Sequence, residues 1–290
     1  MSLRLTDYCL PESSDEVVGL LERYGDGALI VGGGTFIHGL DARGLLVDVE
    51  ALIDIQKLRL DAVESGADGI LIGATTTCAE LAHEPAVRNE PWLCAVRDAL
   101  GFIPVQVANA ATVGGCIATA CALFDLPVAL TALDGEVAAR GSKGTRWIAL
   151  EAFCTGMFES SLGRSEFLEQ VRLPQPPSRT ASACTKLEGN ANDLAIVNAA
   201  VSVTLDERGA CSDARVVVGG GVGATLVRSS AAEQVVRGAM LDEGTLRAAG
   251  RAAADELEPL SDHRASGAYR KTVAAVLVRR ALERALTRLA

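Results

Sequence analysis

The sequence predicts a chain of two domains, each of which combines helices with short β-strands. Its 290 residues exceed the usual length of one domain and suit two. The segment LPQPPSRT (173–180) holds three prolines in eight residues, which is typical of a linker. Apolar runs of strand length, bounded by glycines, occur on both sides of it. We therefore expect a first domain at 1–174 and a second at 180–290.

Composition excludes several classes of function. The formal net charge of −10 argues against binding to a nucleic-acid backbone, which requires a basic surface. No run of about 18 uncharged apolar residues predicts a transmembrane helix. The first residues, MSLRLTDYCLPESSDE, show neither the apolar stretch nor the cleavage site of a signal peptide. We expect a cytoplasmic protein that does not insert into membranes.

The first domain begins with a helix over 13–25, which Ser14 and Asp15 favour as cap-forming residues. An apolar run at 28–31 predicts a strand that ends in three glycines, and GLLVDVE (44–50) and GILIGAT (69–75) predict two more. From Thr76 to Leu100 the pattern is helical, with breaks at Pro85 and Pro91. A short helix, DLPVALTAL, then leads to a strand, GEVAAR.

The second domain begins with two strands within 195–221, joined by a polar turn at 206–209, which predicts an antiparallel pair. Helices are expected at 230–239 and 243–256, and a long basic amphipathic helix at 266–290. The apolar stripe of that last helix is expected to pack on its own domain; it comprises Val273, Val276, Leu277, Leu282 and Leu286. The run Gly219–Gly221 is interpreted as a turn that ends a strand.

The eight cysteines are expected to be reduced core residues rather than cluster ligands. No two of them form a C-x-x-C motif, and Cys116 and Cys121 are the closest pair. The three histidines, His38, His83 and His263, lie far apart in the sequence and indicate no metal site. We therefore expect neither a metal ion nor an iron–sulfur cluster on this chain.

Two glycine loops carry the chemistry of the first domain. The first comprises Gly32, Gly33, Gly34, Thr35 and Phe36, and its glycines let the backbone approach a ligand closely. Their N–H groups can form a concavity for an anion, to which Thr35 adds a hydroxyl. The second loop comprises Thr112, Val113, Gly114, Gly115 and Cys116, and it offers the same combination of a hydroxyl, glycines and exposed amides. Neither loop is a G-x-G-x-x-G or Walker A motif.

A pair of such loops, roughly 80 residues apart in one domain, could hold a pyrophosphate from both sides. This pairing indicates a dinucleotide ligand more strongly than either loop does alone. The residues by themselves do not choose between FAD and another nucleotide.

The motifs resemble those of the FAD-binding (medium) subunits of the molybdenum hydroxylases, the xanthine dehydrogenase and aerobic carbon monoxide dehydrogenase family. GGGTFI (32–37) is similar to the family's A-G-G-T-D-L, and NAATVGGCIATACALFDLP (109–127) to its N-x-A-T-I-G-G-N-I-A-x-A followed by D-L-x-P. FLEQVRLP (167–174), KLEGNANDLAIVNAAV (186–201) and SDHRASGAYRKTVAAVLVRRAL (261–282) resemble later family segments. The resemblance covers essentially the whole chain in the family's order.

The resemblance implies an α+β fold. Its first part is an FAD-binding domain of the vanillyl-alcohol-oxidase (PCMH) type with two subdomains, at about 1–53 and 54–174. A smaller C-terminal α+β domain with an antiparallel sheet follows.

The resemblance also implies roles for single residues. Both glycine loops would bind the pyrophosphate of FAD, Phe102 would lie near the flavin, and Asp125 would hydrogen-bond to the ribityl or adenosine part. Leu168 would offer a backbone contact to the ring system. Lys186 would lie near the isoalloxazine, where a cation stabilises the anionic reduced flavin. No residue is expected to be catalytic in the sense of an acid, base or nucleophile.

Three positions depart from the family pattern. Cys116 replaces an Asn at the phosphate site, Phe36 stands where Asp is common, and Gly189 replaces the Arg of K-x-x-R. These departures concern flavin affinity and redox tuning rather than the fold.

The implied function is electron transfer. The chain would accept electrons from [2Fe-2S] clusters of a small subunit and pass them to NAD+ or another acceptor. A large subunit would carry molybdopterin, and the assembly would be a dimer of heterotrimers. Two other functions remain open: a self-contained FAD oxidoreductase, with covalent flavin attachment through Cys116 or Cys121, and an assembly subunit whose loops are vestigial.

Overall fold

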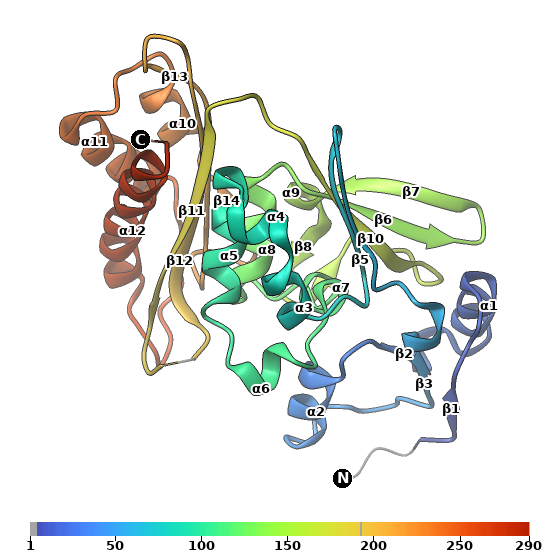
Figure 1. Cartoon of the computed structure of the whole chain (residues 1–290). Helices are drawn as coiled ribbons and strands as arrows, with labels where there is room; N and C mark the ends of the chain where they lie inside the picture. The colour runs from blue at the N-terminus through green and yellow to red at the C-terminus, as the bar shows by residue number, and fades with distance from the viewer. Residues whose placement is uncertain (1–4, 192, 290) are drawn as a thin grey trace.

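Three larger sheets succeed one another along the chain in the computed structural model, which describes residues 5–191 and 193–289 (Figure 1). The first is parallel, with the order β1-β3-β2, and the second is antiparallel, with the order β4-β5-β10-β6-β7. The third is antiparallel, with the order β11-β12-β13-β14, and β8 and β9 form a separate small pair. The sheets lie within 7–54, 63–174 and 180–228.

The strands have the following bounds: β1 Asp7–Cys9, β2 Ala28–Val31, β3 Ala51–Asp54, β4 Val63–Gly66, β5 Gly69–Gly73, β6 Glu136–Gly141, β7 Gly144–Ala149, β8 Cys154–Gly156, β9 Glu159–Ser160, β10 Phe167–Pro174, β11 Thr180–Glu188, β12 Ala195–Leu205, β13 Cys211–Gly219 and β14 Val227–Arg228.

The α-helices are α1 Ser14–Tyr24, α2 Thr35–Asp41, α3 Cys78–His83, α4 Pro85–Asn89, α5 Cys94–Leu100, α6 Val105–Ala108, α7 Val113–Ala118, α8 Asp125–Ala132, α9 Leu150–Phe153, α10 Ser230–Val236, α11 Glu243–Asp255 and α12 Gly267–Thr287. Short 3-10 turns lie at Gly25–Gly27, Gln56–Leu58 and Pro91–Leu93.

The predicted strand at 44–50 is wrong. The strand in this part of the chain is β3, which begins at Ala51, one residue after the predicted strand ends. Gly44 and Asp48 have φ angles of +66° and +62°, a left-handed conformation that an extended strand cannot contain. Leu45 and Val47 are 60% and 63% exposed, so the apolar run that suggested a strand does not face a core.

The other predicted elements are confirmed with small shifts at their ends. The helix at 13–25 is α1, but its N-cap is Ser13, whose side chain accepts a hydrogen bond from the Glu16 N–H, rather than Ser14 or Asp15. The broken helical stretch from Thr76 is α3, α4 and α5, interrupted at the two prolines. The strands β1, β4, β7, β8, β9, β11 and β14 have no counterpart in the sequence prediction.

The third sheet is covered on both faces. The helices α10, α11 and α12 lie on one face and α5 and α8 on the other (Figure 1). The core under α12 is built from alternate strand residues such as Val197, Val201 and Val203, together with Ala274, Leu277 and other small or branched side chains of the helices. The long C-terminal helix therefore packs on its own sheet, as predicted.

The segment 261–282, which resembles a segment of the family, holds the start of α12 against the third sheet through hydrogen bonds of Arg270. The Arg270 side chain is 1% exposed and donates to the carbonyl oxygens of Ile196 (2.6 Å) and Gly220 (2.9 Å) and to both oxygens of Asp262 (2.7 Å each). Gly220 and Gly221 have φ angles of +82° and +74°, so the glycine run is a turn that ends β13, as predicted. Arg270 and Asp262 thus have a structural role.

A small apolar core joins the first and second predicted domains. It is rich in alanine, which lets helices and sheet approach closely, and it comprises Ala95, Ala99, Val128, Ala129, Ala132, Cys184, Ala200, Val217 and Leu226. Asp98 of α5 lies beside this core. Its carboxylate accepts hydrogen bonds from the Cys184 N–H (3.0 Å) and from two Arg288 nitrogens (2.8 Å each). The predicted boundary between the two domains, at residues 174–180, remains a prediction, because this core combines residues from both sides of it.

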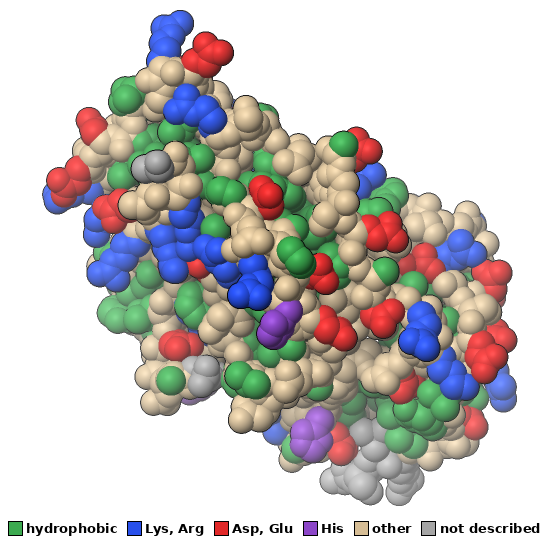
Figure 2. Space-filling view, in the orientation of Figure 1, with side chains coloured by type: hydrophobic (Ala, Val, Ile, Leu, Met, Phe, Trp, Pro, Cys, Tyr) green, Lys and Arg blue, Asp and Glu red, His purple; other side chains and the backbone are tan. Residues whose placement is uncertain are grey.

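The surface carries charges of both signs. Figure 2 shows Lys and Arg side chains gathered on the side of the molecule where α12 lies, while acidic side chains are spread over the rest of that face. None of the described helices is both long and apolar enough to cross a membrane.

Candidate functional site

The first glycine loop connects β2 to α2. Gly34 is the N-cap of α2 and has a φ of +68°, a conformation that favours glycine. Among the described residues, we find no acceptor for the backbone N–H groups of Gly33, Gly34 and Thr35. The loop is partly exposed, so these three donors face a ligand or solvent. Such a run of unpaired N–H groups is a binding concavity for an anion.

The second glycine sequence is the start of a helix rather than an open loop. Thr112 is the N-cap of α7, and it is 5% exposed. The N–H groups of the next four residues all have acceptors in the chain: Val113 donates to Thr76 O (2.9 Å), Gly114 to Ala74 O (2.9 Å), Gly115 to Thr112 Oγ1 (3.1 Å) and Cys116 to Thr112 O (2.9 Å). The expectation of exposed amides at this loop is therefore wrong. The N–H groups of residues 113–116 are therefore not free for a ligand, and the Thr112 hydroxyl and the partly exposed Cys116 are the side chains that remain.

The structure brings the two loops into direct contact. A Cβ placed on Gly33 would lie 1.6 Å from the carbonyl oxygen of Ala110, and one on Gly32 would lie 2.7 Å from Thr112 Oγ1. Any side chain at these two glycines would force the loops apart. The pairing predicted from the sequence thus has a physical basis in close backbone packing.

An aromatic group borders the first loop. The Phe36 ring lies 6.0 Å from the Phe124 ring, edge to face, and 5.6 Å from the Phe158 ring, measured between centroids. Phe158 is 56% exposed and has a φ of +62°, an uncommon conformation for an aromatic residue. Sequence reasoning missed Phe124 and Phe158, because nothing in their spacing links them to position 36.

A buried charged group lies beyond Phe124. Lys186 Nζ contacts Asp125 Oδ2 at 2.9 Å and Glu188 Oε2 at 3.0 Å, and the lysine side chain is 3% exposed. The same Nζ lies 5.3 Å from the centre of the Phe102 ring, within the range of a cation–π contact. Three residues that the resemblance assigned to the flavin, Phe102, Asp125 and Lys186, are therefore neighbours.

The balance of charge in this group is negative. Burial raises the pKa of the Asp125 carboxyl, while Lys186 and a hydrogen bond from Asn198 Nδ2 (2.7 Å) oppose that shift. Lys186 faces two carboxylates, so its positive charge is already matched before any ligand arrives. Its capacity to stabilise an anionic ring is smaller than that of an unpaired lysine.

Leu168 lies on β10, a strand that contacts α7. Its side chain is 4% exposed and belongs to the core of the first domain. A bulge between Leu168 and Gln170 interrupts the pairing with β6. A bulge re-aims backbone groups, which suits the predicted backbone contact at this position.

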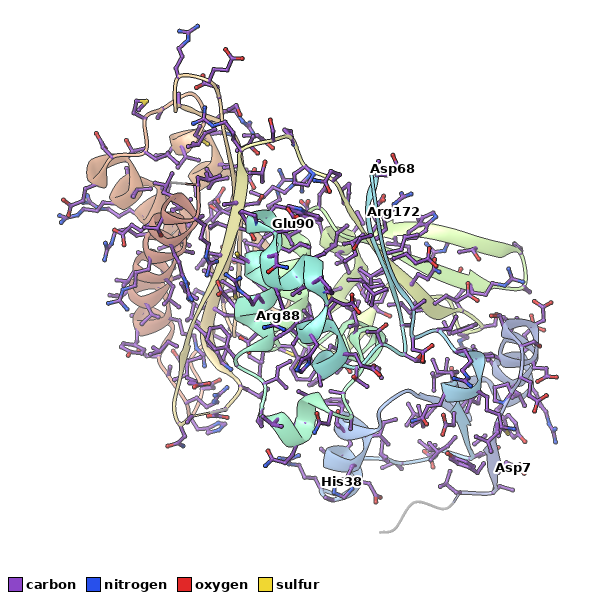
Figure 3. All side chains as sticks on the ribbon, viewed as in Figure 1. Asp7, His38, Asp68, Arg88, Glu90 and Arg172 are labelled. Atoms are coloured by element: carbon purple, nitrogen blue, oxygen red, sulfur yellow. The ribbon has the colours of Figure 1, made fainter. Side chains whose placement is uncertain are left out.

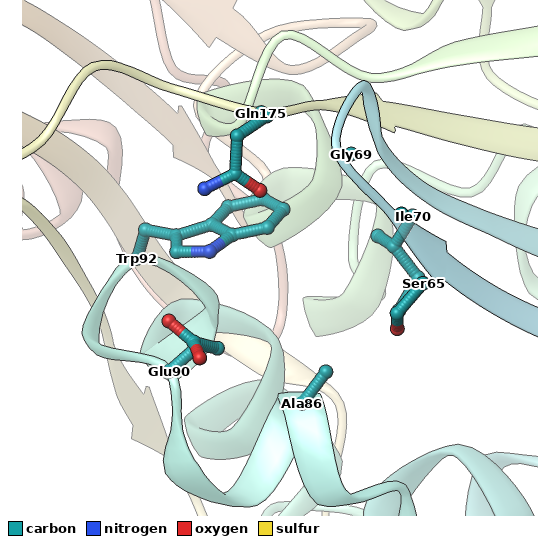
Figure 4. Close-up of a pocket in the computed structure, with 8 residues that line it drawn as sticks. Ser65, Gly69, Ile70, Ala86, Glu90, Trp92 and Gln175 are labelled. Atoms are coloured by element: carbon teal, nitrogen blue, oxygen red, sulfur yellow. The ribbon is translucent and has the colours of Figure 1, made fainter.

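The two cavities that we describe lie elsewhere. One, of about 170 Å³, lies between the β4–β5 hairpin and the segment that carries Glu90 and Trp92 (Figure 4). The other, of about 310 Å³, lies at the β6–β7 hairpin. Neither is lined by a residue of the glycine loops.

Histidine and cysteine positions add no metal site within the described part of the chain, where no three His, Cys, Asp or Glu side chains gather as ligands. His38 lies on α2 at one end of the molecule, far from Arg88 and Glu90 (Figure 3). All eight cysteines are free thiols, and five of them are buried.

Comparison with known families matches nearly the whole chain. The family described as the FAD binding domain in molybdopterin dehydrogenase matches residues 3–176, and the CO dehydrogenase flavoprotein C-terminal domain matches residues 182–285. The chain is 35% identical over 289 residues to the 6-hydroxypseudooxynicotine dehydrogenase complex subunit alpha of Paenarthrobacter nicotinovorans, covering 97% of this chain and 95% of that one. It is 30% identical over 293 residues to the carbon monoxide dehydrogenase medium chain of Afipia carboxidovorans, covering 97% of each.

Solved structures show the same fold. Carbon monoxide dehydrogenase from Hydrogenophaga pseudoflava, in a form that lacks the Mo-pyranopterin moiety, matches with a TM-score of 0.93 at 29% identity and covers 100% of both chains. Quinoline 2-oxidoreductase from Pseudomonas putida 86 matches with a TM-score of 0.90 at 25% identity, again over 100% of both chains.

Proposed function

We propose a function from the family to which this chain belongs, the FAD-binding medium subunits of the molybdenum hydroxylases. The chain is the flavoprotein component of an oxidoreductase. In the proposal, electrons arrive from [2Fe-2S] clusters on a small partner subunit and leave this chain for NAD+ or another acceptor. The observation that carries the proposal is the row of unpaired N–H groups in the first glycine loop, packed against Thr112.

The residues present fit a diphosphate. Gly33, Gly34 and Thr35 offer three N–H donors without an acceptor among the described residues. The hydroxyl of Thr112 accepts from the Gly115 N–H, so its own hydrogen can be donated outward. In the proposal the first loop holds the diphosphate mainly through its backbone, and the second loop contributes the Thr112 hydroxyl and the Cys116 side chain.

The flavin ring is assigned to the region of Phe102, Asp125, Leu168 and Lys186. When bound, FAD supplies the chemistry of taking up electrons one at a time and releasing them in pairs. In this region the Phe102 ring and the core side of β10 exclude water. The ion pair of Asp125 and Lys186 sets the charge beside the ring. No side chain of this chain acts as acid, base or nucleophile on the organic substrate.

The partners in the proposal are an iron–sulfur small subunit and a molybdopterin large subunit, in a cytoplasmic dimer of heterotrimers. Relatives named as a medium chain and as a subunit of a dehydrogenase complex support a shared assembly.

Co-purification tests this function. The tagged full chain should bring down two further subunits, and cofactor analysis should find FAD on this chain with iron and molybdenum on the others. Addition of NADH to the complex should bleach the flavin absorbance if NAD+ is the acceptor, whereas an unchanged spectrum assigns another acceptor. Organic-substrate turnover by this polypeptide alone, or a complex without flavin, would overturn the proposal.

A further inference from the structure

Two thiols meet behind the second glycine loop. Cys78 is the first residue of α3, Cys116 lies in α7, and their Sγ atoms are 3.9 Å apart. This separation is a contact distance for sulfur, and a disulfide would shorten it to about 2 Å. The pair is 38 residues apart in the sequence, so its spacing did not reveal it.

The segments that carry the two thiols are tied together by their backbones. The Cys78 N–H donates to Ala111 O at 2.8 Å, and the Val113 N–H donates to Thr76 O at 2.9 Å. Between these bonds Thr77 and Thr112 form an antiparallel bridge. Bridged residues have Cα atoms roughly 4.5–5.5 Å apart. The bridge therefore fixes the two segments side by side, one residue before Cys78 and four residues before Cys116.

The two thiols differ in acidity. The hydrogen bond between the two thiols lowers the pKa of Cys78, although burial opposes this, and the same bond together with burial raises the pKa of Cys116. The thiolate is the reactive form of a cysteine, so a lowered pKa favours reaction at Cys78. Cys116 is only partly buried and follows the exposed Gly115, whereas Cys78 is 1% exposed. Of the two residues, Cys116 is therefore the more accessible to a small oxidant.

We propose that Cys78 and Cys116 are a redox-active dithiol in the wall of the FAD site, converted reversibly to a disulfide by hydrogen peroxide. Peroxide oxidises one thiol to a sulfenic acid and is itself reduced to water. The other sulfur then attacks the sulfenic sulfur, the S–S bond forms, and hydroxide leaves and takes up the released proton as a second water. The sum is two thiols and one peroxide giving one disulfide and two waters.

The evidence for the dithiol is the contact between the two sulfur atoms. The claim that it lies in the wall of the FAD site depends on the proposed function. Cys116 belongs to the helix whose cap, Thr112, touches the first loop at Gly32. Closing the sulfur contact from 3.9 Å to about 2 Å draws the first turn of α7 toward α3. Bound FAD, which in the proposal covers Cys116, should slow the oxidation.

Mass spectrometry of the full chain in its complex tests the dithiol. After brief treatment with hydrogen peroxide and alkylation of the remaining thiols, digestion should give one peptide pair joined through Cys78 and Cys116, and dithiothreitol should remove it. The variants Cys78→Ser and Cys116→Ser should lose this product completely. Cys121→Ser, a change at a buried thiol five residues after Cys116 in the sequence, should keep it. Absence of the product in the unchanged chain, or a product joined mainly through Cys121, would overturn the dithiol.

The same assay, run with FAD bound and after flavin removal, separates the two claims. Slower cross-linking with FAD bound supports both the dithiol and its position. Equal rates in the two forms leave the dithiol standing and overturn its place in the wall of the site. A chain that never retains FAD refutes the proposed function, and its cross-linking result still decides for or against the dithiol.

Discussion

Gly33 is the residue on which contact between the two loops depends most directly. An added Cβ would lie 1.6 Å from the Ala110 carbonyl oxygen, which belongs to the backbone and cannot turn aside as a side chain could. We expect Gly33→Ala to lower the free energy of unfolding by about 1–3 kcal/mol through overpacking and to reduce bound FAD. Equilibrium unfolding in urea and the ratio of flavin to protein are the measurements.

Gly19→Ala is the matched control for that substitution. Gly19 lies inside α1, and an added Cβ there meets nothing within 4 Å. Alanine favours a helix interior, so this variant should gain about 0.5–1 kcal/mol and keep its flavin. Equal effects of the two substitutions would contradict the account of the loop contact.

Lys186 neutralises a carboxylate that burial makes costly. In Lys186→Met the buried Asp125 loses its ion-pair partner, and we expect the free energy of unfolding at about pH 7 to fall by about 3 kcal/mol. The folded-state pKa of Asp125 is raised above its ordinary value, so protonation favours the folded state, and the deficit should shrink when the pH falls to about 5. Urea unfolding at both pH values measures the effect.

Lys57→Met serves as the control for Lys186→Met. The pair of Lys57 with Glu12 is exposed, with side chains 49% and 76% accessible, so its loss should change stability by less than about 1 kcal/mol. A deficit of Lys186→Met that stays constant between the two pH values would show that Asp125 does not titrate as described.

At the candidate site, the sequence predicted which residues take part better than it predicted which atoms they contact. It placed Phe102, Asp125 and Lys186 together only through a family resemblance, and the structure shows them as neighbours. It could not predict that the Val113 and Gly114 amides of the second loop are already paired, because their acceptors belong to Thr76 and Ala74, about 40 residues earlier in the chain. Local patterns do not record such tertiary partners.

At the level of elements, periodicity and turn residues located most helices and strands, including the long helix α12 and the hairpin of β12 and β13. The failure at 44–50 shows the limit of an apolar run as a signal, because left-handed residues and exposure there are set by tertiary packing. The short strands β8 and β9 were missed because two or three residues give no alternation to detect.

The junction between β13 and α12 should give a characteristic pH dependence. Burial raises the pKa of Asp262, but the Ala265 and Arg264 N–H groups and the Arg270 guanidinium together lower it to about 2. The stabilisation is therefore present above the unfolded-state pKa of about 4 and is lost as the pH falls from about 4 to about 2. The difference in unfolding free energy between the unchanged chain and Asp262→Asn should be constant near neutral pH and shrink over that interval.

Circular dichroism during urea unfolding, repeated across the acidic range, measures this difference. Because the change removes a carboxylate from a buried arginine, a difference that persists unchanged at about pH 2 would contradict the role given to Asp262.

For the whole molecule, the predicted fold is confirmed: an FAD-binding domain of the vanillyl-alcohol-oxidase type is followed by the CO dehydrogenase flavoprotein C-terminal domain. The sequence did not reveal how the two parts are joined. Small residues such as Ala95, Ala129 and Ala200 show no distinctive pattern in the sequence, yet together they form the interface core.

Asp98 is one of the polar links across this interface. In Asp98→Ala, Arg288 loses a two-point contact and the Cys184 N–H loses its acceptor, so we expect a loss of about 2–4 kcal/mol in unfolding free energy. Asp213→Ala, which removes an exposed pair with Arg237, should cost less than about 1 kcal/mol. Similar costs for the two changes in urea unfolding would mean that the link carries no stability.

Flavin binding by the refolded or flavin-stripped full chain tests the central claim, that the first glycine loop holds a diphosphate through its backbone. Titration calorimetry should show FAD binding at one equivalent, FMN binding more weakly and riboflavin more weakly still, because each step removes phosphate. Gly33→Ala should abolish the preference for FAD. Equal affinity for the three flavins, or no binding of FAD at all, would contradict the claim.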